Sequence, residues 1–154
     1  MKKIALASAL MIAISVGTGF AAPINNLSNG QTALGVQDQS VYIEHKFSNS
    51  LTLGLQENDI YGQFDLNKNL RLVAGSKDFN HNSEIYAGVG LTSPLASNVD
   101  GYASLVAGSG FKDMQIGANV NVAPNFDINL NYRSLMPDAG SDHNRTSVGA
   151  SIKF

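Results

Sequence analysis

The stretch Thr146–Phe154 reads TSVGASIKF and ends with the last residue of the sequence. Its apolar side chains alternate strictly with small or polar ones. The apolar positions are Val148, Ala150, Ile152 and Phe154, and the positions between them are Ser147, Gly149, Ser151 and Lys153. Side chains of a β-strand point alternately to its two faces, so this period of two predicts a strand with one apolar and one polar face.

The same alternation returns along the chain. It marks nine earlier segments, over residues 31–36, 41–47, 51–56, 60–66, 70–75, 85–91, 99–107, 114–122 and 126–133. With the C-terminal strand these make ten, and an even number is expected of a closed antiparallel bacterial barrel. The sequence therefore predicts an all-β fold, a closed antiparallel up-and-down transmembrane β-barrel of about ten strands. Eight strands is the alternative, if the weak first strand and one short hairpin within residues 51–66 pair poorly.

The beginning of the chain has the layout of a secretory signal peptide. Two lysines are followed by the uncharged apolar run Ile4–Val16 and then by small residues up to Ala21, which is the order that a signal peptidase reads. A transmembrane anchor is the alternative, but it needs roughly 20 apolar residues, and this run is shorter. We therefore predict a signal peptide over residues 1–21 and one outer-membrane β-barrel domain over residues 22–154.

The composition narrows the possible classes of function. The chain has 10 basic and 12 acidic residues, and Lys2 and Lys3 fall in the predicted signal, which leaves 8 basic against 12 acidic residues and a formal charge of −4. Without a basic face, nucleic acid is not an expected partner. The chain has no cysteine, so neither disulfides nor thiol chemistry is expected. After the predicted signal there is no second long apolar run, so the chain could cross a membrane only as a closed barrel.

The connections fall into two sets, because successive turns of an antiparallel barrel lie on opposite sides of the membrane. We assign residues 48–49, 67–69, 93–98 and 123–125 to the periplasmic side, and residues 37–39, 57–59, 77–83, 108–112 and 136–145 to the external side. Most of the periplasmic turns are short and carry asparagine, which tolerates the positive φ of tight hairpin turns. Phe47, Phe64, Phe126 and Phe154 stand at the periplasmic strand ends, and they predict an aromatic girdle at one membrane interface.

Alternation alone does not tell which face is inside. A soluble periplasmic ligand-binding barrel would turn the apolar row inward. The polar row here is rich in Gly, Asn, Ser and Tyr and poor in charge, unlike a water-facing row, which favours a membrane barrel with a polar lumen. That lumen is expected to hold Glu44, Lys46, Asp65, Arg71, Asp100, Asp127, Arg133 and Lys153. Four acids and four bases in a narrow lumen predict paired side chains that close it, with a small-solute conduit as the alternative.

The histidines do not form a convincing catalytic pattern. His45 falls on the apolar face, and His81 and His143 fall in external loops. His81, Ser83 and Glu84 have the residue types of a Ser-His-acid hydrolase. The His-x-Ser order superficially resembles that of outer-membrane lipid A deacylases, but in those enzymes the motif lies on a late strand that faces the membrane. We predict a solvated loop and no catalytic residue.

The acidic clusters of the loops are the remaining candidates for a ligand site. Glu57 lies near Asp59, and Asp138 and Asp142 share the longest loop with His143. Such groups can hold Ca²⁺ weakly, but neither has an ordered ligand spacing. We predict no metal site, no cofactor-binding site and no cofactor.

The final hairpin resembles the end of a known family. The residues that carry the resemblance are Asn131-Tyr132-Arg133-Ser134-Leu135, then Gly140, Asp142, Asn144-Arg145, and Val148-Gly149 through to Phe154. This order of a Tyr-Arg strand, a Gly-Asp-Asn-Arg loop and a Val-Gly strand is similar to the YfaZ family of small outer-membrane proteins, with weaker similarity around Leu34-Gly35-Val36. The resemblance implies a fold and a location, and no biochemical role.

The closing strand also resembles that of bacterial outer-membrane β-barrels in general. In those proteins the terminal aromatic residue, here Phe154, implies recognition by the barrel-assembly machinery. Further expected partners are outer-membrane lipid and lipopolysaccharide. We predict an integral protein of the cell outer membrane in a Gram-negative-type envelope, with a structural or surface-interaction role and no catalysis. The alternatives are a narrow porin-like channel for small solutes, an outer-membrane lipid-modifying enzyme and a soluble periplasmic ligand-binding barrel.

Overall fold

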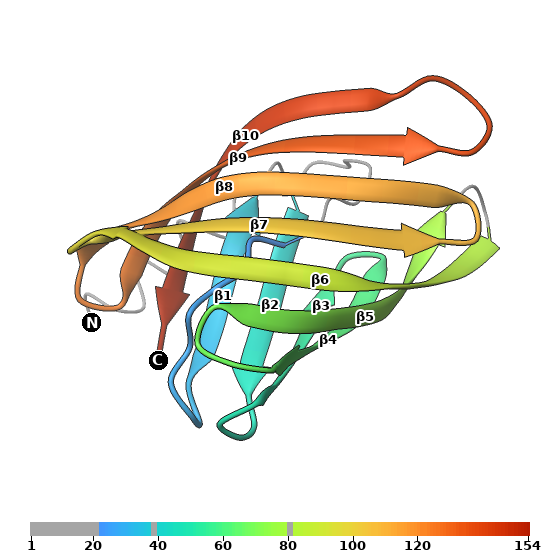
Figure 1. Ribbon diagram of the computed structural model, residues 1–154. Coiled ribbons are helices and arrows are strands. Elements are labelled where there is room, and N and C mark those ends of the chain that lie inside the picture. Colours follow the sequence, from blue (N-terminus) through green and yellow to red (C-terminus); the bar gives the residue numbers. More distant parts are fainter. Residues whose placement is uncertain (1–21, 38–39, 80–81) are drawn as a thin grey trace.

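The computed structural model describes residues 22–37, 40–79 and 82–154, and within these ranges the chain forms ten strands joined by turns (Figure 1). The strands are β1 (Thr32–Gln37), β2 (Ser40–Lys46), β3 (Leu51–Gln56), β4 (Asp59–Asp65), β5 (Leu70–Phe79), β6 (Asn82–Ala96), β7 (Val99–Gly108), β8 (Phe111–Ala123), β9 (Phe126–Pro137) and β10 (His143–Lys153). The predicted signal peptide, residues 1–21, lies outside the described residues and stays a prediction. Across the described ranges, no helix has the length and apolar character needed to cross a membrane.

The strands form one closed barrel in which each pairs antiparallel with its neighbours along the chain. Closure comes from β1 and β10, whose register runs from Ala33 opposite Lys153 to Gln37 opposite Gly149. The weak first strand is therefore the one that closes the wall. The short hairpin of β3 and β4 also pairs along its whole length, from Leu51 to Gln56. The ten-strand prediction is confirmed, and the eight-strand alternative is wrong.

The two halves of the wall differ in height. Strands β1–β4 have six or seven residues each, whereas β5–β10 have between 10 and 15 (Figure 1). The later strands run further than the alternation predicted, and β6 continues through a register shift between Pro94 and Ala96. The predicted connections shorten accordingly, and residues 93–96 belong to β6. The five-residue connection between Pro137 and His143 lies on the predicted external side.

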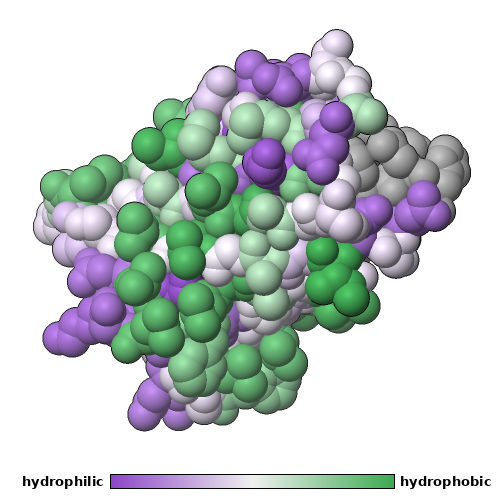
Figure 2. All heavy atoms as spheres, turned by 45° about the vertical axis from the view of Figure 1, so that its right-hand side comes forward, coloured by the Kyte–Doolittle hydropathy of each residue, from purple (hydrophilic) through white to green (hydrophobic). Residues whose placement is uncertain are grey.

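The polarity of the barrel is inverted relative to a soluble protein. Large apolar side chains such as Leu55, Leu91 and Leu130, each about half exposed, cover the outside. On the face that Figure 2 presents, hydrophobic residues form broad areas with hydrophilic ones between them. The buried residues are mostly polar or charged. Only a bilayer makes such a surface favourable, and a closed barrel satisfies every strand edge within it. The structure confirms the predicted outer-membrane barrel, and the soluble-barrel alternative is wrong.

The predicted aromatic girdle lies at the end of the barrel where β10 finishes, which we assign to the periplasm. Phe47, Phe64 and Phe154 are 59 %, 48 % and 66 % exposed on the outer face. Phe126 lies beside them at the start of β9 but is half-buried. Phe154 is held by backbone hydrogen bonds to Thr32, of 2.8 and 2.9 Å. Aromatic side chains at this level match the interface between lipid tails and headgroups.

Tyrosines inside the barrel lie on glycines of the neighbouring strand. The described residues include all five tyrosines of the chain, and four of them lie directly opposite a glycine of the neighbouring strand. The pairs are Tyr42 with Gly35, Tyr61 with Gly54, Tyr86 with Gly75, and Tyr102 with Gly117. A Cβ atom built on Gly54 would overlap the Tyr61 ring, closer than real atoms can approach. Because glycine has no side chain, each tyrosine ring has room to lie flat against the wall of the narrow lumen.

Replacing Gly54 by alanine is therefore expected to lower the free energy of unfolding by about 1–3 kcal/mol, the usual range for overpacking. The matched control is Gly62→Ala on β4, where the nearest atom to the new Cβ would be the end of the Leu53 side chain, at 3.3 Å. The two changes are chemically identical, so guanidinium unfolding in lipid vesicles isolates the effect of the ring. Equal stability of the two variants would contradict the packing described.

Candidate functional site

Oppositely charged side chains meet in the periplasmic half of the lumen. Lys46 Nζ lies 2.5 Å from Asp65 Oδ2, and Arg71 Nε lies 3.4 Å from Asp65 Oδ1. Lys153 Nζ lies 2.5 Å from Asp127 Oδ2. Lone charges would be costly in so narrow a space, and pairing removes most of that cost. The predicted pairing of the lumen charges is confirmed for these five residues.

Arg133 and Asp113 form a further pair in the external half of the lumen. Arg133 Nε donates to Asp113 Oδ1 at 2.7 Å, and a second contact joins Arg133 Nη2 to Asp113 Oδ2. Both side chains are almost completely buried. Arg133 was a predicted lumen residue, whereas Asp113 was not. Asp100, also predicted in the lumen, is half-buried opposite Asn119.

Glu44 is buried at 1 % exposure, and its carboxylate accepts hydrogen bonds from three neutral side chains. Tyr61 Oη and Gln63 Nε2 each donate to Glu44 Oε1 at 2.9 Å. Asn25 Nδ2 donates to Glu44 Oε2 at 2.7 Å. Hydrogen bonds to a buried carboxylate compensate for the water that it has lost. One of these donors, Asn25, precedes β1 and belongs to none of the strands that form the wall.

Residues Pro23–Leu27, which we call the lumen segment, lie inside the barrel. Ile24, Asn25 and Leu27 are 4 %, 2 % and 8 % exposed. The backbone oxygen of Ile24 accepts a hydrogen bond from Asn119 Nδ2 at 2.8 Å, and that of Asn25 accepts one from Arg71 Nη1 at 3.3 Å. From the sequence this stretch reads as a polar lead-in before the first strand. The structure instead makes it part of the filling of the lumen.

A tight turn directs the lumen segment back into the barrel. Gln31 N donates to Ser28 O at 3.0 Å, and Gly30 between them has a φ of +78°. That value is the one a type II turn requires at its third residue, where glycine is favoured. The turn lies beside Lys46, whose backbone oxygen accepts from Gly30 N at 2.8 Å. The segment therefore enters the lumen from the periplasmic end.

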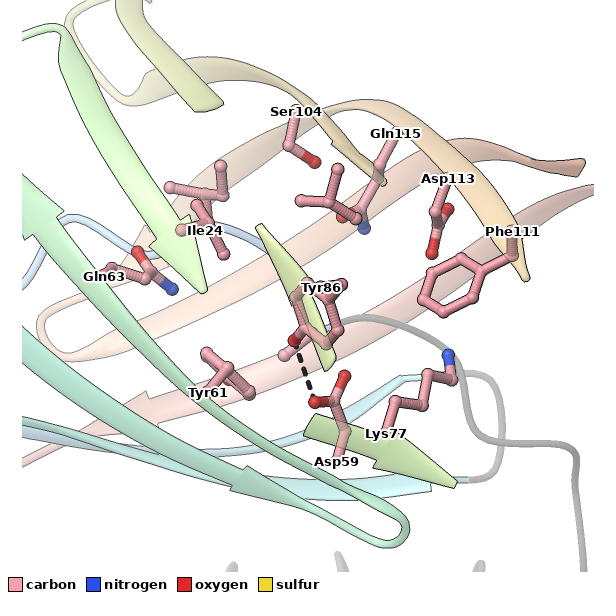
Figure 3. A pocket seen from close by; sticks show the side chains of 13 residues that line it. Ile24, Asp59, Tyr61, Gln63, Lys77, Tyr86, Ser104, Phe111, Asp113 and Gln115 are labelled. Carbon is pink, nitrogen blue, oxygen red and sulfur yellow. Dashed lines mark hydrogen bonds between the residues drawn. The ribbon is translucent and has the colours of Figure 1, made fainter. Parts of the chain in front are cut away.

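A small cavity remains beyond the lumen segment, in the external half of the lumen (Figure 3). Its volume is about 40 Å³, which at about 10–15 Å³ each holds roughly three water molecules. The lining residues are Ala22, Ile24, Asp59, Tyr61, Gln63, Val73, Lys77, Tyr86, Ser104, Val106, Phe111, Asp113 and Gln115. Lumen-facing side chains such as Glu44, Gln115 and Asn129 are at most 2 % exposed, so the described part of the lumen is densely filled.

The charged lining of this cavity was not predicted from the sequence. Asp59, expected in an external loop, begins β4 and accepts a hydrogen bond from Tyr86 Oη at 2.8 Å (Figure 3). Lys77 lies opposite Asp59 in the pairing of β4 with β5 and is buried, at 4 % exposure. Lys77 Nζ has no hydrogen-bond partner among the described residues. Both positions become lumen positions because the strands run further than the alternation indicated.

The remaining candidates from the sequence are described in part. His81 lies outside the described residues. Ser83 Oγ donates to Asp78 Oδ1 at 2.7 Å, and Glu84 accepts from Ser109. His45 lies on the outer face as predicted, 2.8 Å from Thr32 Oγ1 and with its ring against Phe47.

The acidic loop residues are separated in a similar way. Asp138, Asp142 and His143 are exposed at the external end, and Glu57 accepts from Ser40 Oγ at 3.2 Å. Within the described ranges, no group of three or more His, Asp or Glu side chains is placed to hold a metal ion.

The sequence matches no family model and no curated protein. Among solved structures, the KdgM porin is similar over 80 % of this chain and 98 % of its own, with 9 % identity and a TM-score of 0.48. The N-terminal β-barrel domain of OprF from Pseudomonas aeruginosa is similar over 82 % and 98 %, with 12 % identity and a TM-score of 0.39. Ail, the attachment invasion locus protein of Yersinia pestis, is similar over 82 % and 100 %, with 13 % identity and a TM-score of 0.43. The predicted YfaZ membership stays a prediction.

Proposed function

We propose that this protein works as a closed integral barrel of the outer membrane, with a structural or surface-interaction role and without catalysis. The observation that carries the proposal is the filled lumen. Paired charges, four tyrosines and the lumen segment together leave the described interior with a cavity of about 40 Å³. A barrel with such an interior offers partners its lipid-facing wall and its external connections.

The absence of catalysis is part of the proposal. It is supported by the hydrogen bond of the Ser83 hydroxyl to Asp78, since a hydrolase serine needs an imidazole in that place. Phe154 supports the further proposal that the assembly machinery reads the closing strand, because its exposed ring stands at the periplasmic rim. Lipid and lipopolysaccharide are the partners that the exposed apolar wall would meet.

The intact protein, purified and refolded, is expected to leave planar bilayers silent, because buried side chains fill the part of the lumen that the structure describes. The same preparation is expected to run faster on SDS gels before boiling than after, as folded barrels do. Steady conductance of the intact barrel would contradict a closed lumen and favour the narrow channel. One observation favours the narrow channel. The lumen segment, which fills part of the lumen, is not a strand of the barrel wall.

A further inference from the structure

We propose that the lumen segment, Pro23–Leu27, is a removable plug and that the barrel behind it is a conduit for small ions and polar solutes. The proposal rests on the closed lumen proposed above and adds that one segment of chain completes the closure. The barrel would thus have a second, conducting state. Four observations carry this inference.

First, the wall does not depend on the lumen segment for the pairing of its charges. If Asn25 leaves, Glu44 keeps the hydrogen bonds from Tyr61 and Gln63. Arg71 keeps Asp65 at 3.4 Å and Gln63 Oε1 at 2.8 Å. When the segment leaves, Glu44 and Arg71 therefore each keep a polar partner in the wall. Water would replace the hydrogen bonds that they made to the segment.

Second, the lumen segment is held by side-chain packing of Ile24 and Leu27 and by hydrogen bonds, none of which belongs to the strand ladder. The shortest hydrogen bond is that of Asn25 Nδ2 to Glu44 Oε2, at 2.7 Å. Asn119 and Arg71 donate to backbone oxygens of the segment at 2.8 and 3.3 Å. Arg71 also donates to Asn26 Oδ1 at 3.2 Å, and Asn25 Nδ2 donates to Tyr42 Oη at 3.4 Å. The segment makes none of the strand pairings of the described barrel. It can leave without breaking the sheet.

Third, the wall has a place shaped for the segment. A Cβ atom on Gly90 would lie 2.7 Å from Ile24 Cδ1, so Ile24 occupies the room that a side chain on β6 would otherwise fill. When the segment leaves, this space opens toward the cavity that Ile24 also lines. The glycine makes the lumen wide at the level of the plug.

Fourth, the lumen segment is long enough to fill much of the height of the lumen. Five residues of extended chain reach at most about 17 Å, a large part of the roughly 25 Å height of a lipid-facing band. The segment is joined to β1 through the turn at Gly30, so it could swing out toward the periplasm as one piece. The path that it clears is lined by Glu44 and Asp65 together with Lys46 and Arg71. Because both signs are present, little preference for cations or anions is expected.

The test uses Asn25→Asp, which keeps every other residue of the segment. The new carboxylate oxygen takes the place of the Nδ2 that now lies 2.7 Å from Glu44 Oε2, so a hydrogen bond becomes a repulsion. Asn29→Asp is the matched control, since the same change is made at an exposed position of the turn. Adding Glu44→Gln to Asn25→Asp removes the repulsion and is expected to restore closure.

Two readouts separate release from conduction. The chain has no cysteine, so Ile24→Cys gives a single thiol whose reaction with a membrane-impermeant maleimide reports exposure of the segment. We expect labelling at least about ten times faster with Asn25→Asp than without it, because an attractive contact is lost and a repulsive one added. We also expect conductance steps in planar bilayers from Asn25→Asp and from a deletion of residues 23–27, and silence from the intact protein and Asn29→Asp.

The outcomes decide between the two proposals. Conductance of the intact protein overturns the closed barrel itself. If the intact protein is silent, a folded variant whose thiol at position 24 is labelled but which does not conduct overturns the plug. So does a deletion that folds, by its shift on SDS gels, and stays silent. If the deletion does not fold and the thiol at position 24 stays protected with Asn25→Asp, the segment is a fixed part of the barrel, and the plug is again overturned.

Discussion

Replacing Asp113 by alanine is expected to lower the free energy of unfolding by about 3–5 kcal/mol, the range found when one partner of a buried ion pair is removed. Asp113 and Arg133 are both almost fully buried and share two contacts. Without the carboxylate, the Arg133 guanidinium loses the two contacts with Asp113 in a narrow lumen that also holds the buried Lys77.

Guanidinium unfolding of the refolded barrel in lipid vesicles measures the effect. Lys112→Ala on the same strand is the control, because Lys112 is exposed and a surface change of this kind costs within about 0.5 kcal/mol. The double variant Asp113→Leu with Arg133→Met replaces the pair by apolar groups and is expected to recover much of the loss. If the double variant is as unstable as Asp113→Ala, the loss does not come from a stranded charge.

Replacing Leu130 by arginine is expected to lower the free energy of unfolding by about 2–4 kcal/mol, the cost of placing this cation against lipid near the middle of a bilayer. Leu130 lies in the middle of β9 and is 51 % exposed on the outer face. In water an exposed leucine tolerates this substitution well, because the new charge is hydrated. The size of the effect therefore reports which solvent the outer face meets.

Unfolding in lipid vesicles, with Ala139→Arg as the control, measures this second effect. Ala139 is exposed in the connection between β9 and β10, on the predicted external side. The same charge placed there is expected to change the stability by no more than about 0.5 kcal/mol. Similar effects at Leu130 and Ala139 would mean that the outer face of β9 does not contact lipid.

The barrel could be predicted from the sequence because lipid imposes a strict rule on one face of each strand. Side chains such as Leu51, Leu53 and Leu55 must be apolar where they meet the bilayer, and the lumen positions between them are free to be polar. The rule fails where the strands leave the lipid. At the external ends of β5 and β8, outward positions such as Ser76 and Lys112 are also polar, so the alternation is lost. Lys77 and Asp113 were missed for this reason.

The lumen segment could not be predicted because nothing local marks it. Pro23–Leu27 has neither the period of a strand nor that of a helix, and its two apolar residues fit an ordinary loop. Its place depends on contacts far apart in the chain, such as that between Ile24 and Asn119, which are 95 residues apart. The one local signal is Gly30, whose positive φ turns the chain back toward the lumen. A glycine before a first strand is too common to have indicated this.

The unequal height of the wall has a consequence for the surrounding bilayer. At about 3.3 Å per residue, the seven residues of β2 or β4 rise roughly 23 Å along their own axis, and less along the membrane normal once the strand is tilted. The lipid-facing band of an outer-membrane barrel is about 25 Å tall, which is more than that. Hydrophobic mismatch then requires the lipids beside β1–β4 to shorten, at a cost of a fraction of a kcal/mol per Å, while those beside β6–β9 need not. The bilayer around the barrel would thus be thinner beside β1–β4 than beside β6–β9. Other proteins with a short hydrophobic span would be better matched to the bilayer on that thinner side.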